Sequence, residues 1–447
     1  MPRSDAADSD SERACSCETH GPLNCAVVLF TRDLRVHDNP ALAGAAREAD
    51  RVVPLFVLEE RLLAGSAPRA RLLAAALHDL DRSLRRLGAA LVVRRGDVAA
   101  ETIRVVRESN AQAVFVAEDV SAYAHRREQR LSEQVEVRSF PGITVVPPGV
   151  VTPSGRECYR VFTPYHRAWA AMPWRAPEQR PARLTIADGV EVGDLPPSSS
   201  EGGETAARAG LERWLAEGDS LYAGLRDDLA ADATSKLSIP LHLGLISPLE
   251  VATRSANREL VRQLAWRDFY AQLLAANPWS AGRDLNPRNG EWSDDPVGLA
   301  AWKEGLTGYP VVDAGMRELA ATGFMHNRAR MIVASFLTKD LNVDWREGAA
   351  HFASLLLDGD VASNTGNWQW AAGTGVDTRP GRIFNPTLQA QRYDRSGDYV
   401  RRWIPELRGI PGAAVHEPWR LGPLLGGGYP APIVDHAAAA ARYRARG

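Results

Sequence analysis

Five short runs of aliphatic and β-branched residues alternate with amphipathic stretches in the first third of the chain. The runs are CAVVLF, RVVPLFVLEE, ALVVRRG, AQAVFVAED and VEVRSF, at residues 25–30, 51–60, 90–96, 111–119 and 135–140. Between them lie segments such as ARLLAAALHDLDRSLRRLG, residues 70–88, whose leucines recur at helical spacing. Apolar strands separated by helices indicate a parallel sheet that is covered on both faces. We therefore predict a doubly wound, Rossmann-like α/β domain over residues 25–145.

The remaining chain has a different pattern. Residues 146–206 read as a connecting segment, because 176–206 are rich in Pro, Gly, Ser and acidic residues. Residues 207–447 show helical periodicity with few β-rich runs, which predicts an all-α second domain. Within it we expect one helix at 258–276 and a helix, a turn and a helix at 322–348.

Length and composition agree with two globular domains. The chain has 447 residues, of which 45% are hydrophobic and 24% charged, and this length exceeds what one core usually serves. Since no apolar run reaches the roughly 18 residues of a membrane span, we expect a soluble protein without a membrane partner. The net charge of −2 argues against a surface that binds polyanions nonspecifically, but it is compatible with a local basic groove.

Four cysteines are too few for a disulfide scaffold at this length, which favours a reducing cytoplasm. Cys15 and Cys17 lie in a polar leader, residues 1–24, that lacks the apolar core of a signal peptide and is predicted to be disordered. A metal site there would lack partner ligands, so two idle thiols are favoured and no metal is predicted.

Several segments of the second domain carry candidate chemistry. In the helix at 258–276, Gln263, Trp266, Arg267 and Tyr270 fall on one stripe, at i, i+3, i+4 and i+7. A semi-buried packing face remains the alternative, although packing alone seldom selects Gln and Arg. Asn327, Arg328, Arg330 and Met331 stand together at the head of the segment 322–348, and His326 beside them is interpreted as structural.

Two further segments carry residue types that can bind phosphate groups. Thr234, Ser235, Lys236 and Ser238 precede an expected helix and could cradle a diphosphate, or form a simple helix cap. Residues 379–408 hold seven arginines against three acids, a net of plus four, which could be a basic surface for phosphates or a solvated charged face. The first strand runs into TRDLRVHDNPAL without a G-x-G-x-x-G or Walker loop, so nicotinamide and P-loop functions lose support.

The densest polar segment is DGDVASNTGNWQW, residues 358–370. It combines two carboxylates, three amides and two indoles within thirteen positions.

These segments together resemble the DNA photolyase and cryptochrome family, most closely the microbial class I cyclobutane pyrimidine dimer photolyases. The motifs that carry the resemblance occur in family order: RDLRVHDNPAL, YRVFTPYHRAW, TSKLS, WRDFY, WKEGLTGYPVVDAGMREL, MHNRARM, ASFLTKDL, DWREG, DGDVASN, NWQW, RIFNP and HEPW. The resemblance implies an antenna domain followed by a helical domain that holds FAD. In that family, blue light drives an electron from reduced flavin into a dimer flipped out of UV-damaged DNA, and photolyases are a standard example of such base flipping.

The resemblance also implies roles for individual residues. FAD contacts would be Tyr222, Thr234, Ser235, Lys236, Leu237, Ser238, Arg330, Asp358, Asp360 and Asn364, with Arg330 paired to Asp358 and Asn364 facing flavin N5. An electron relay to the surface would run through Trp368, Trp345 and Trp292. We expect residues 358–370 to form a single loop between cofactor and substrate.

On the DNA side, the implied lesion contacts are Gln263, Trp266, Asn327, Met331 and Trp370, and the DNA-facing residues are Arg226, Arg267, Arg328 and Gln389. The (6-4) photolyases carry histidines at the positions of Asn327 and Met331, so their absence favours cyclobutane dimers. Gln263 replaces the expected glutamate, which keeps a hydrogen-bond donor but removes a transferable proton. Lys236 replaces an expected arginine and loses the bidentate fork.

The sequence leaves alternatives for the antenna chromophore and for the biological role. Tyr123 and Ala124 replace the Asn-Glu pair of folate-binding members, which favours 8-hydroxy-5-deazaflavin over methenyltetrahydrofolate at Asp119 and Arg32, with an antenna-free protein as the alternative. The leading interpretation is a monomeric photolyase that repairs dimers. A cryptochrome-like photoreceptor without repair is the alternative, and a plain electron-transfer flavoprotein would not explain the lesion-side residues.

Overall fold

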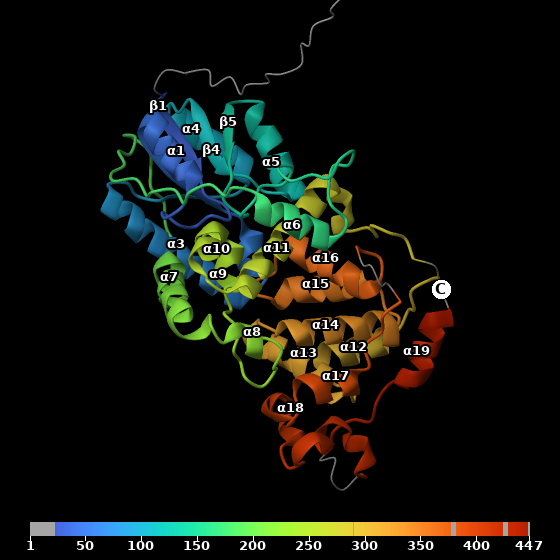
Figure 1. Ribbon diagram of the computed structural model, residues 1–447. Coiled ribbons are helices and arrows are strands. Elements are labelled where there is room, and N and C mark those ends of the chain that lie inside the picture. The colour runs from blue at the N-terminus through green and yellow to red at the C-terminus, as the bar shows by residue number, and fades with distance from the viewer. Residues whose placement is uncertain (1–22, 289, 377–380, 423–427, 446–447) are drawn as a thin grey trace, which may run out of the picture.

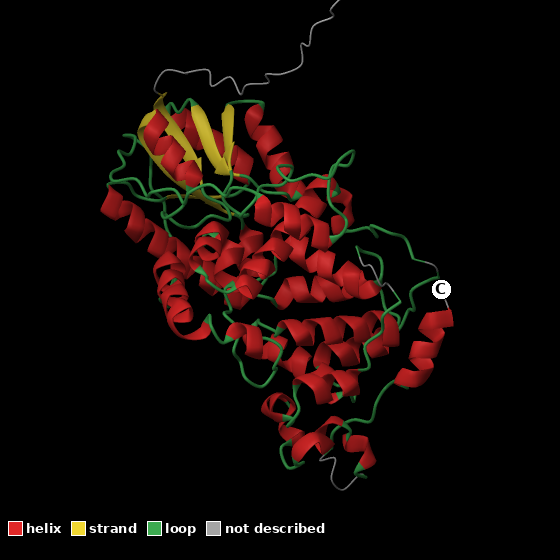
Figure 2. Ribbon diagram, viewed as in Figure 1, coloured by secondary structure: helices red, strands yellow, loops and turns green. Residues whose placement is uncertain are grey.

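The computed structural model describes residues 23–288, 290–376, 381–422 and 428–445. Its α/β part is a parallel sheet in the order β3-β2-β1-β4-β5. The strands are β1 (Leu23–Leu29), β2 (Ala49–Leu58), β3 (Val92–Arg95), β4 (Ala113–Ala117) and β5 (Glu136–Phe140). They lie at one end of the molecule, and helices make up most of the rest (Figure 1; Figure 2). The prediction of a doubly wound α/β domain followed by a helical domain is confirmed.

Both faces of the sheet are covered, which explains its continuously apolar strands. Alternate residues of β1 enter different cores: Ala26 and Val28 pack with α1 (Pro40–Glu48) and α3 (Ala67–Leu87), whereas Val27 and Leu29 pack with α4 (Val98–Ser109) and α5 (Ala122–Ser132). The short helix α2 (Glu60–Ala64) precedes α3.

The strand β1 begins earlier than the sequence suggested. Leu23 pairs with Ala49 and is buried, so the last two residues of the expected leader belong to the sheet. Cys15 and Cys17 lie outside the described residues, and among the described ones Cys25 and Cys158 are free, buried thiols.

The connecting segment lies against the α/β domain. After α6 (Phe162–Ala171), residues 172–202 contain neither helix nor strand. Their backbone nevertheless bonds to the sheet domain, with Val52 N donating to Thr185 O at 2.8 Å and Val93 N to Val192 O at 2.7 Å. These bonds satisfy backbone groups that would otherwise be exposed at the sheet edge.

The helical domain has no strand within its described residues. Its elements are α7 (Gly203–Arg213), the π-helical turn η1 (Trp214–Gly218), α8 (Tyr222–Leu225), α9 (Ser238–Leu243), α10 (Pro248–Arg254), α11 (Arg258–Ala276), η2 (Pro278–Ala281), α12 (Pro296–Glu304), α13 (Pro310–Thr322), α14 (Asn327–Ser335), η3 (Phe336–Asp340), α15 (Trp345–Leu355), α16 (Val361–Ala372), α17 (Pro386–Tyr393), α18 (Asp398–Trp403), η4 (Pro405–Leu407), η5 (Gly412–His416), η6 (Pro418–Arg420) and α19 (His436–Ala445). The helix α11 coincides with the predicted one.

The expectation of a loop at 358–370 is wrong, because residues 361–372 form α16. The Asp360 carboxylate caps this helix by accepting from Ser363 N at 2.8 Å, and Gly373 ends it in the left-handed conformation. The glycine and the two asparagines inside it have low helix propensity, so packing contributes much of its stability. A Cβ on Gly366 would lie 2.2 Å from the ring of Tyr270, which shows how closely α11 and α16 approach.

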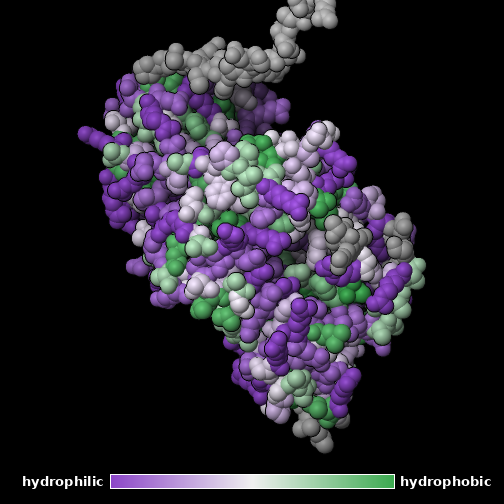
Figure 3. Space-filling model, in the orientation of Figure 1, coloured by the Kyte–Doolittle hydropathy of each residue, from purple (hydrophilic) through white to green (hydrophobic). Residues whose placement is uncertain are grey.

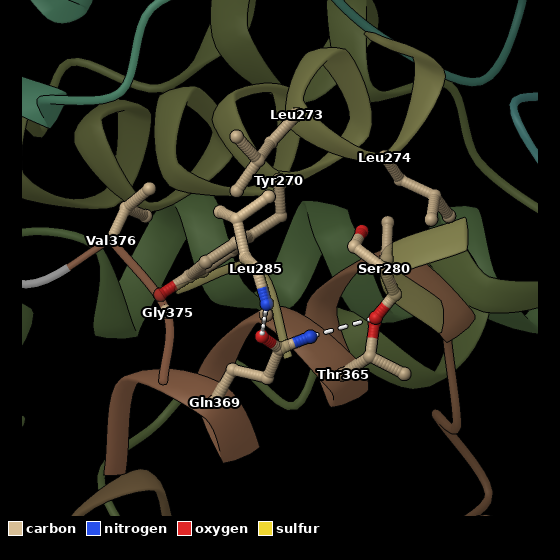
Figure 4. A pocket seen from close by; sticks show the side chains of 11 residues that line it. Tyr270, Leu273, Leu274, Ser280, Leu285, Thr365, Gln369, Gly375 and Val376 are labelled. Atoms are coloured by element: carbon tan, nitrogen blue, oxygen red, sulfur yellow. Dashed lines mark hydrogen bonds between the residues drawn. The ribbon is translucent and has the colours of Figure 1, made fainter. Parts of the chain in front are cut away.

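The other end of α16 is fixed by Gln369. Its amide donates to Ser280 O at 2.7 Å and accepts from Leu285 N at 2.8 Å, beside a cavity of about 280 Å³ between α11 and α16 (Figure 4). One buried side chain thus joins α16 to η2 and to the loop that follows η2.

In the parts of the chain that the structure describes, no helix is long and apolar enough to cross a membrane. On the face shown in Figure 3, hydrophilic residues predominate and hydrophobic ones occur in small scattered groups.

Candidate cofactor and substrate site

A cavity of about 590 Å³, open to solvent, lies among α14, α15 and α16. It brings together residues that the sequence assigned to three different roles. Its lining includes the expected cofactor contacts Arg330, Asp358, Asp360 and Asn364, the expected lesion contacts Asn327, Met331 and Trp370, and Trp368 of the expected relay. Apolar side chains of Ala334, Phe352, Leu356 and Ala371 complete much of its wall.

Asp358 and Arg330 form the central ion pair of this cavity. Arg330 Nη2 lies 2.9 Å from Asp358 Oδ2, and Arg330 Nε donates to Met325 O at 2.8 Å. Burial would raise the pKa of Asp358, but the charge and hydrogen bonds of Arg330, with a hydrogen bond from Ser238, hold it below its usual value. Asp358 Oδ1 is buried without a partner among the described residues. The carboxylate therefore keeps one acceptor for a ligand.

Asp360 is engaged through both oxygens. Its Oδ1 caps α16, and its Oδ2 accepts from Arg32 Nη2 at 2.5 Å. Burial would raise the pKa of Asp360, but the charges of Arg32 and Arg267 keep it well below its usual value. This acid is therefore ionised at neutral pH and already serves as a helix cap and ion-pair partner.

Residues of α14 and α16 are oriented by local bonds. Asn364 Nδ2 donates to Ala349 O at 3.0 Å, which fixes the amide at the cavity wall. His326 caps α14 by accepting from Arg328 N through Nδ1 at 3.1 Å, and burial lowers the pKa of His326 to about 4. His326 is thus neutral and structural at physiological pH.

The three relay tryptophans differ in surroundings. Trp368 and Trp345 are fully buried, and Trp345 Nε1 donates to Asp284 Oδ1 at 2.8 Å. Trp292 is half-buried, with the guanidinium of Arg288 3.8 Å above its ring. Of the three, Trp368 lines the cavity and Trp292 is the one with partial exposure, and the relay through them stays a prediction.

The segment before α9 lies apart from the cavity wall. Tyr222 and Leu237 are buried, and Ser235 Oγ accepts from Leu237 N at 3.4 Å. Lys236 has a φ of +50° and pairs with Asp232 at 2.9 Å, so its charge is already matched. Thr234 Oγ1 is buried without a partner among the described residues, and Ser238 begins α9 beside Asp358.

Two expected lesion residues do not line this cavity. Gln263 is exposed on α11 and makes a 3.4 Å contact to Glu259 O. Trp266 stacks one face on Phe162, with ring centroids 3.6 Å apart and an interplanar angle of 5°. The stripe on α11 therefore lies outside the described lining of this cavity, and Tyr270 is buried at its C-terminal end.

The expected DNA-facing residues are mostly paired. Arg328 binds Asp227 through two bonds of 2.8 and 2.7 Å, Arg226 lies 2.6 Å from Glu259, and Gln389 is half-buried in α17. Arg267 differs from its expected role. Its guanidinium donates to Ile143 O and Leu241 O, so it satisfies carbonyls between the two domains and does not present itself to phosphates.

The expected antenna residues reveal a contact that the sequence did not predict. Arg32 Nη1 lies 3.3 Å from Asp119 Oδ2, but Arg32 Nη2 binds Asp360 across the domain junction. Arg32 and Asp360 are 328 residues apart, so no local pattern could have indicated the contact. His242, whose buried Nδ1 has no partner among the described residues, was also missed.

Comparisons with known proteins agree with this architecture. Residues 26–182 match the model of the DNA photolyase family, and residues 260–446 match the FAD binding domain of DNA photolyase. A curated deoxyribodipyrimidine photo-lyase of Streptomyces griseus is 49% identical, covering 95% of this chain and 100% of the relative. The chain belongs to the DNA photolyase family.

Other relatives widen the comparison. A cryptochrome DASH of Gloeobacter violaceus is 38% identical, covering 92% of this chain and 93% of its own. The crystal structure of a bacterial class III photolyase from Agrobacterium tumefaciens superposes with a TM-score of 0.86 at 34% identity, covering 97% of this chain and 98% of that one.

The residues around the cavity fit a flavin nucleotide. Asp358 Oδ1 at the cavity, and Thr234 Oγ1 and His242 Nδ1 outside its described lining, are buried polar atoms without partners among the described residues, and such atoms are costly unless a ligand satisfies them. Phe352, Leu356 and Met331 supply apolar wall for a planar ring system. Among the described residues, no group of three or more His, Cys, Asp or Glu side chains is arranged to hold a metal ion.

We expect Asp358→Asn to destabilise the protein in a pH-dependent way. Because the pKa of Asp358 is lower in the folded state than in the unfolded state, the ionised carboxylate stabilises the fold above about pH 4. This stabilisation is lost as the pH falls from the unfolded-state pKa to the folded-state pKa. At pH 7 the variant should lose about 1–3 kcal/mol of unfolding free energy, measured by denaturant titration. The difference should shrink at pH 3.

The matched control is Asp232→Asn, whose pair with Lys236 is exposed on both sides. It should cost less than about 1 kcal/mol. A loss at Asp358 that is equal at pH 7 and pH 3 would show that packing, and not the charge, is responsible.

Proposed function

We propose that the protein repairs cyclobutane pyrimidine dimers in DNA by blue light, using bound FAD. The observation that supports this most is the composition of one cavity. Expected cofactor contacts (Asp358, Asn364) and expected lesion contacts (Asn327, Met331) line the same space. A substrate base in that space would lie directly against the cofactor, which a short-range electron transfer requires.

The protein's own groups would hold the cofactor and set its electrostatics. Reduced FAD, when bound, supplies the electron that splits the dimer after light absorption. Asp358 offers its free oxygen to a ligand hydroxyl or N–H, and Arg330 keeps that carboxylate ionised and in place. The amide of Asn364, fixed on Ala349 O, places a neutral polar group in the cavity wall without adding a charge.

A flipped dimer would meet aromatic and polar groups at the cavity. Trp370 lines it, with the guanidinium of Arg382 5.9 Å from its ring, and offers an indole against which bases can stack. Asn327 Nδ2 lies 3.8 Å from Met331 Sδ, so an amide and a thioether stand together at the head of α14. DNA phosphates would compete with Asp227 and Glu259 for Arg328 and Arg226.

A second candidate function is blue-light sensing without repair. It is favoured by the similarity to a cryptochrome DASH and by glutamine at position 263, where a proton-bearing glutamate is expected. Both functions would use the same flavin site, so only activity on damaged DNA separates them.

We also propose a deazaflavin-type antenna near Asp119. Tyr123 occupies a position expected to be Asn in folate-binding members, and its hydroxyl donates to Glu59 at 2.9 Å. The protein is further proposed to act as a monomer in a reducing cytoplasm, in keeping with the free thiols Cys25 and Cys158.

The direct test is repair of an oligonucleotide that contains one thymine dimer. After photoreduction, blue light should restore the undamaged strand, detected by chromatography, whereas protein kept in the dark should not. Normal dimer binding without repair by fully reduced protein would favour the photoreceptor function instead.

The Gln263→Glu substitution tests the role of Gln263, the residue of the α11 stripe that replaces an expected glutamate. Since glutamate can donate a transferable proton, we expect it to change the repair yield per absorbed photon more than the dimer affinity. Gel-shift titration and quantum-yield measurement separate the two. Loss of binding at unchanged yield per bound dimer would contradict the assigned role.

The Trp345→Phe substitution tests the relay. Phenylalanine is much harder to oxidise than tryptophan, so light-driven reduction of oxidised flavin should slow strongly, as followed by absorbance. Repair by chemically reduced protein should stay at the level of the parent. Trp279→Phe, on the exposed indole of η2, is the control and should leave photoreduction unchanged.

A further inference from the structure

We propose that Arg32, a residue of the α/β domain, is a positioning residue for the flavin site in the helical domain. It would hold Asp360 and, through Asp360, the first turn of α16. The inference rests on the proposed function in one respect, namely that the ligand of the cavity is FAD.

Arg32 lies at the junction of the two domains. It follows β1 in the segment TRDLRVHDN, and its side chain is 21% exposed. The guanidinium makes three contacts in three directions: Nε to His242 O at 3.4 Å, Nη1 to Asp119 at 3.3 Å and Nη2 to Asp360 at 2.5 Å. A planar fork can serve all three partners at once, which an ammonium group on a flexible stem cannot.

The contact with Asp360 reaches the functional helix by one further step. Asp360 Oδ2 receives Arg32, while Asp360 Oδ1 caps α16 through Ser363 N and Asp360 O accepts from Asn364 N at 2.8 Å. Asn364, Trp368 and Trp370 all belong to that helix and line the cavity. The orientation of the Asp360 carboxylate therefore sets where the helix begins.

Within the described part of the chain, the other cationic side chains near Asp360 have environments or partners of their own. Arg267 contributes favourable charge, but its guanidinium is bound to the carbonyls of Ile143 and Leu241. His242 is held neutral, because burial lowers its pKa to about 4. Arg69 approaches Gly359 and donates to Ser354 O at 3.3 Å. Without Arg32, the carboxylate would face burial with one strong hydrogen bond fewer.

Asp119 gives an internal control for the direction of the effect. It shares the guanidinium with Asp360 but lies at the end of β4, on the α/β side. If Arg32 acts on the flavin site through Asp360, neutralising Asp119 should leave FAD binding intact or slightly stronger. If Arg32 only ties the domains together, both acids should matter alike.

The experiment measures the dissociation constant of FAD by fluorescence during dilution of the holoprotein. Loss of a hydrogen bond to a buried charge predicts that Arg32→Gln weakens FAD binding about 10- to 100-fold. Arg32→Lys should recover part of the affinity, and Asp119→Asn should match the parent. Arg208→Gln, which breaks a similarly buried pair with Glu250 at 2.6 Å, controls for general loss of an ion pair.

A double-mutant cycle identifies the route of the effect. The variant that combines Arg32→Gln with Asp360→Asn should bind FAD no more weakly than the poorer of the two single variants. Additive losses would overturn the proposal, as would parental affinity in Arg32→Gln. If Arg32→Gln does not fold, the same cycle with Arg32→Lys decides. Failure of the parent protein to bind FAD would instead refute the proposed function.

Discussion

The arrangement of the cavity depends on how one largely buried carboxylate, that of Asp360, is satisfied. It caps α16, and α16 brings Asn364, Trp368 and Trp370, which are expected to serve the cofactor, the relay and the lesion, to the same cavity. A shift of the chain by one residue along this helix would rotate its side chains by about 100° around the helix axis. The cap therefore fixes which residues face the cavity, and Arg32 fixes the cap from another domain. Cofactor binding and the packing of the two domains therefore depend on the same contact between Arg32 and Asp360.

At the domain junction, several arginines donate to backbone carbonyls. Arg35 is fully buried and donates to Gly244 O at 3.0 Å and Gly142 O at 2.9 Å, and Arg267 serves Ile143 and Leu241. Gly244 is required there, because a Cβ would lie 1.9 Å from Arg32 O. Loops that meet between two domains leave carbonyls without strand or helix partners, and guanidinium groups can satisfy several of them at once. Such a junction tolerates little movement, which suits a chain that places cofactor-site residues on both sides of it.

How much of the structure can be predicted from the sequence depends on how far apart along the chain the interacting residues lie. Strand periodicity predicted the sheet, and apolar spacing predicted α11 with its observed ends. The α16 segment was misjudged, because glycine and amides hide a helix whose stability comes from packing on Tyr270 and from the Gln369 bonds. The roles of Asp358, Asn364 and Trp368 came from resemblance, since no local pattern distinguishes a ligand-binding carboxylate from a helix cap. The contact of Arg32 with Asp360 was beyond either approach, because it exists only after two domains have met.

The residue that bears on the choice between the two proposed functions, repair and light sensing, lies outside the described lining of the cavity. Gln263, the residue that departs most from expectation, is exposed on α11 and absent from the described cavity lining. The cavity wall itself is formed by α14, α15 and α16, and Asp360 and Gln369 hold α16 near its two ends. A change at Gln263 can therefore alter what approaches the cavity without altering what the cavity holds. Trp266 on the same helix is stacked on Phe162 and contacts Phe269 edge-on, so of the two expected lesion residues on α11 it is Gln263 that is exposed.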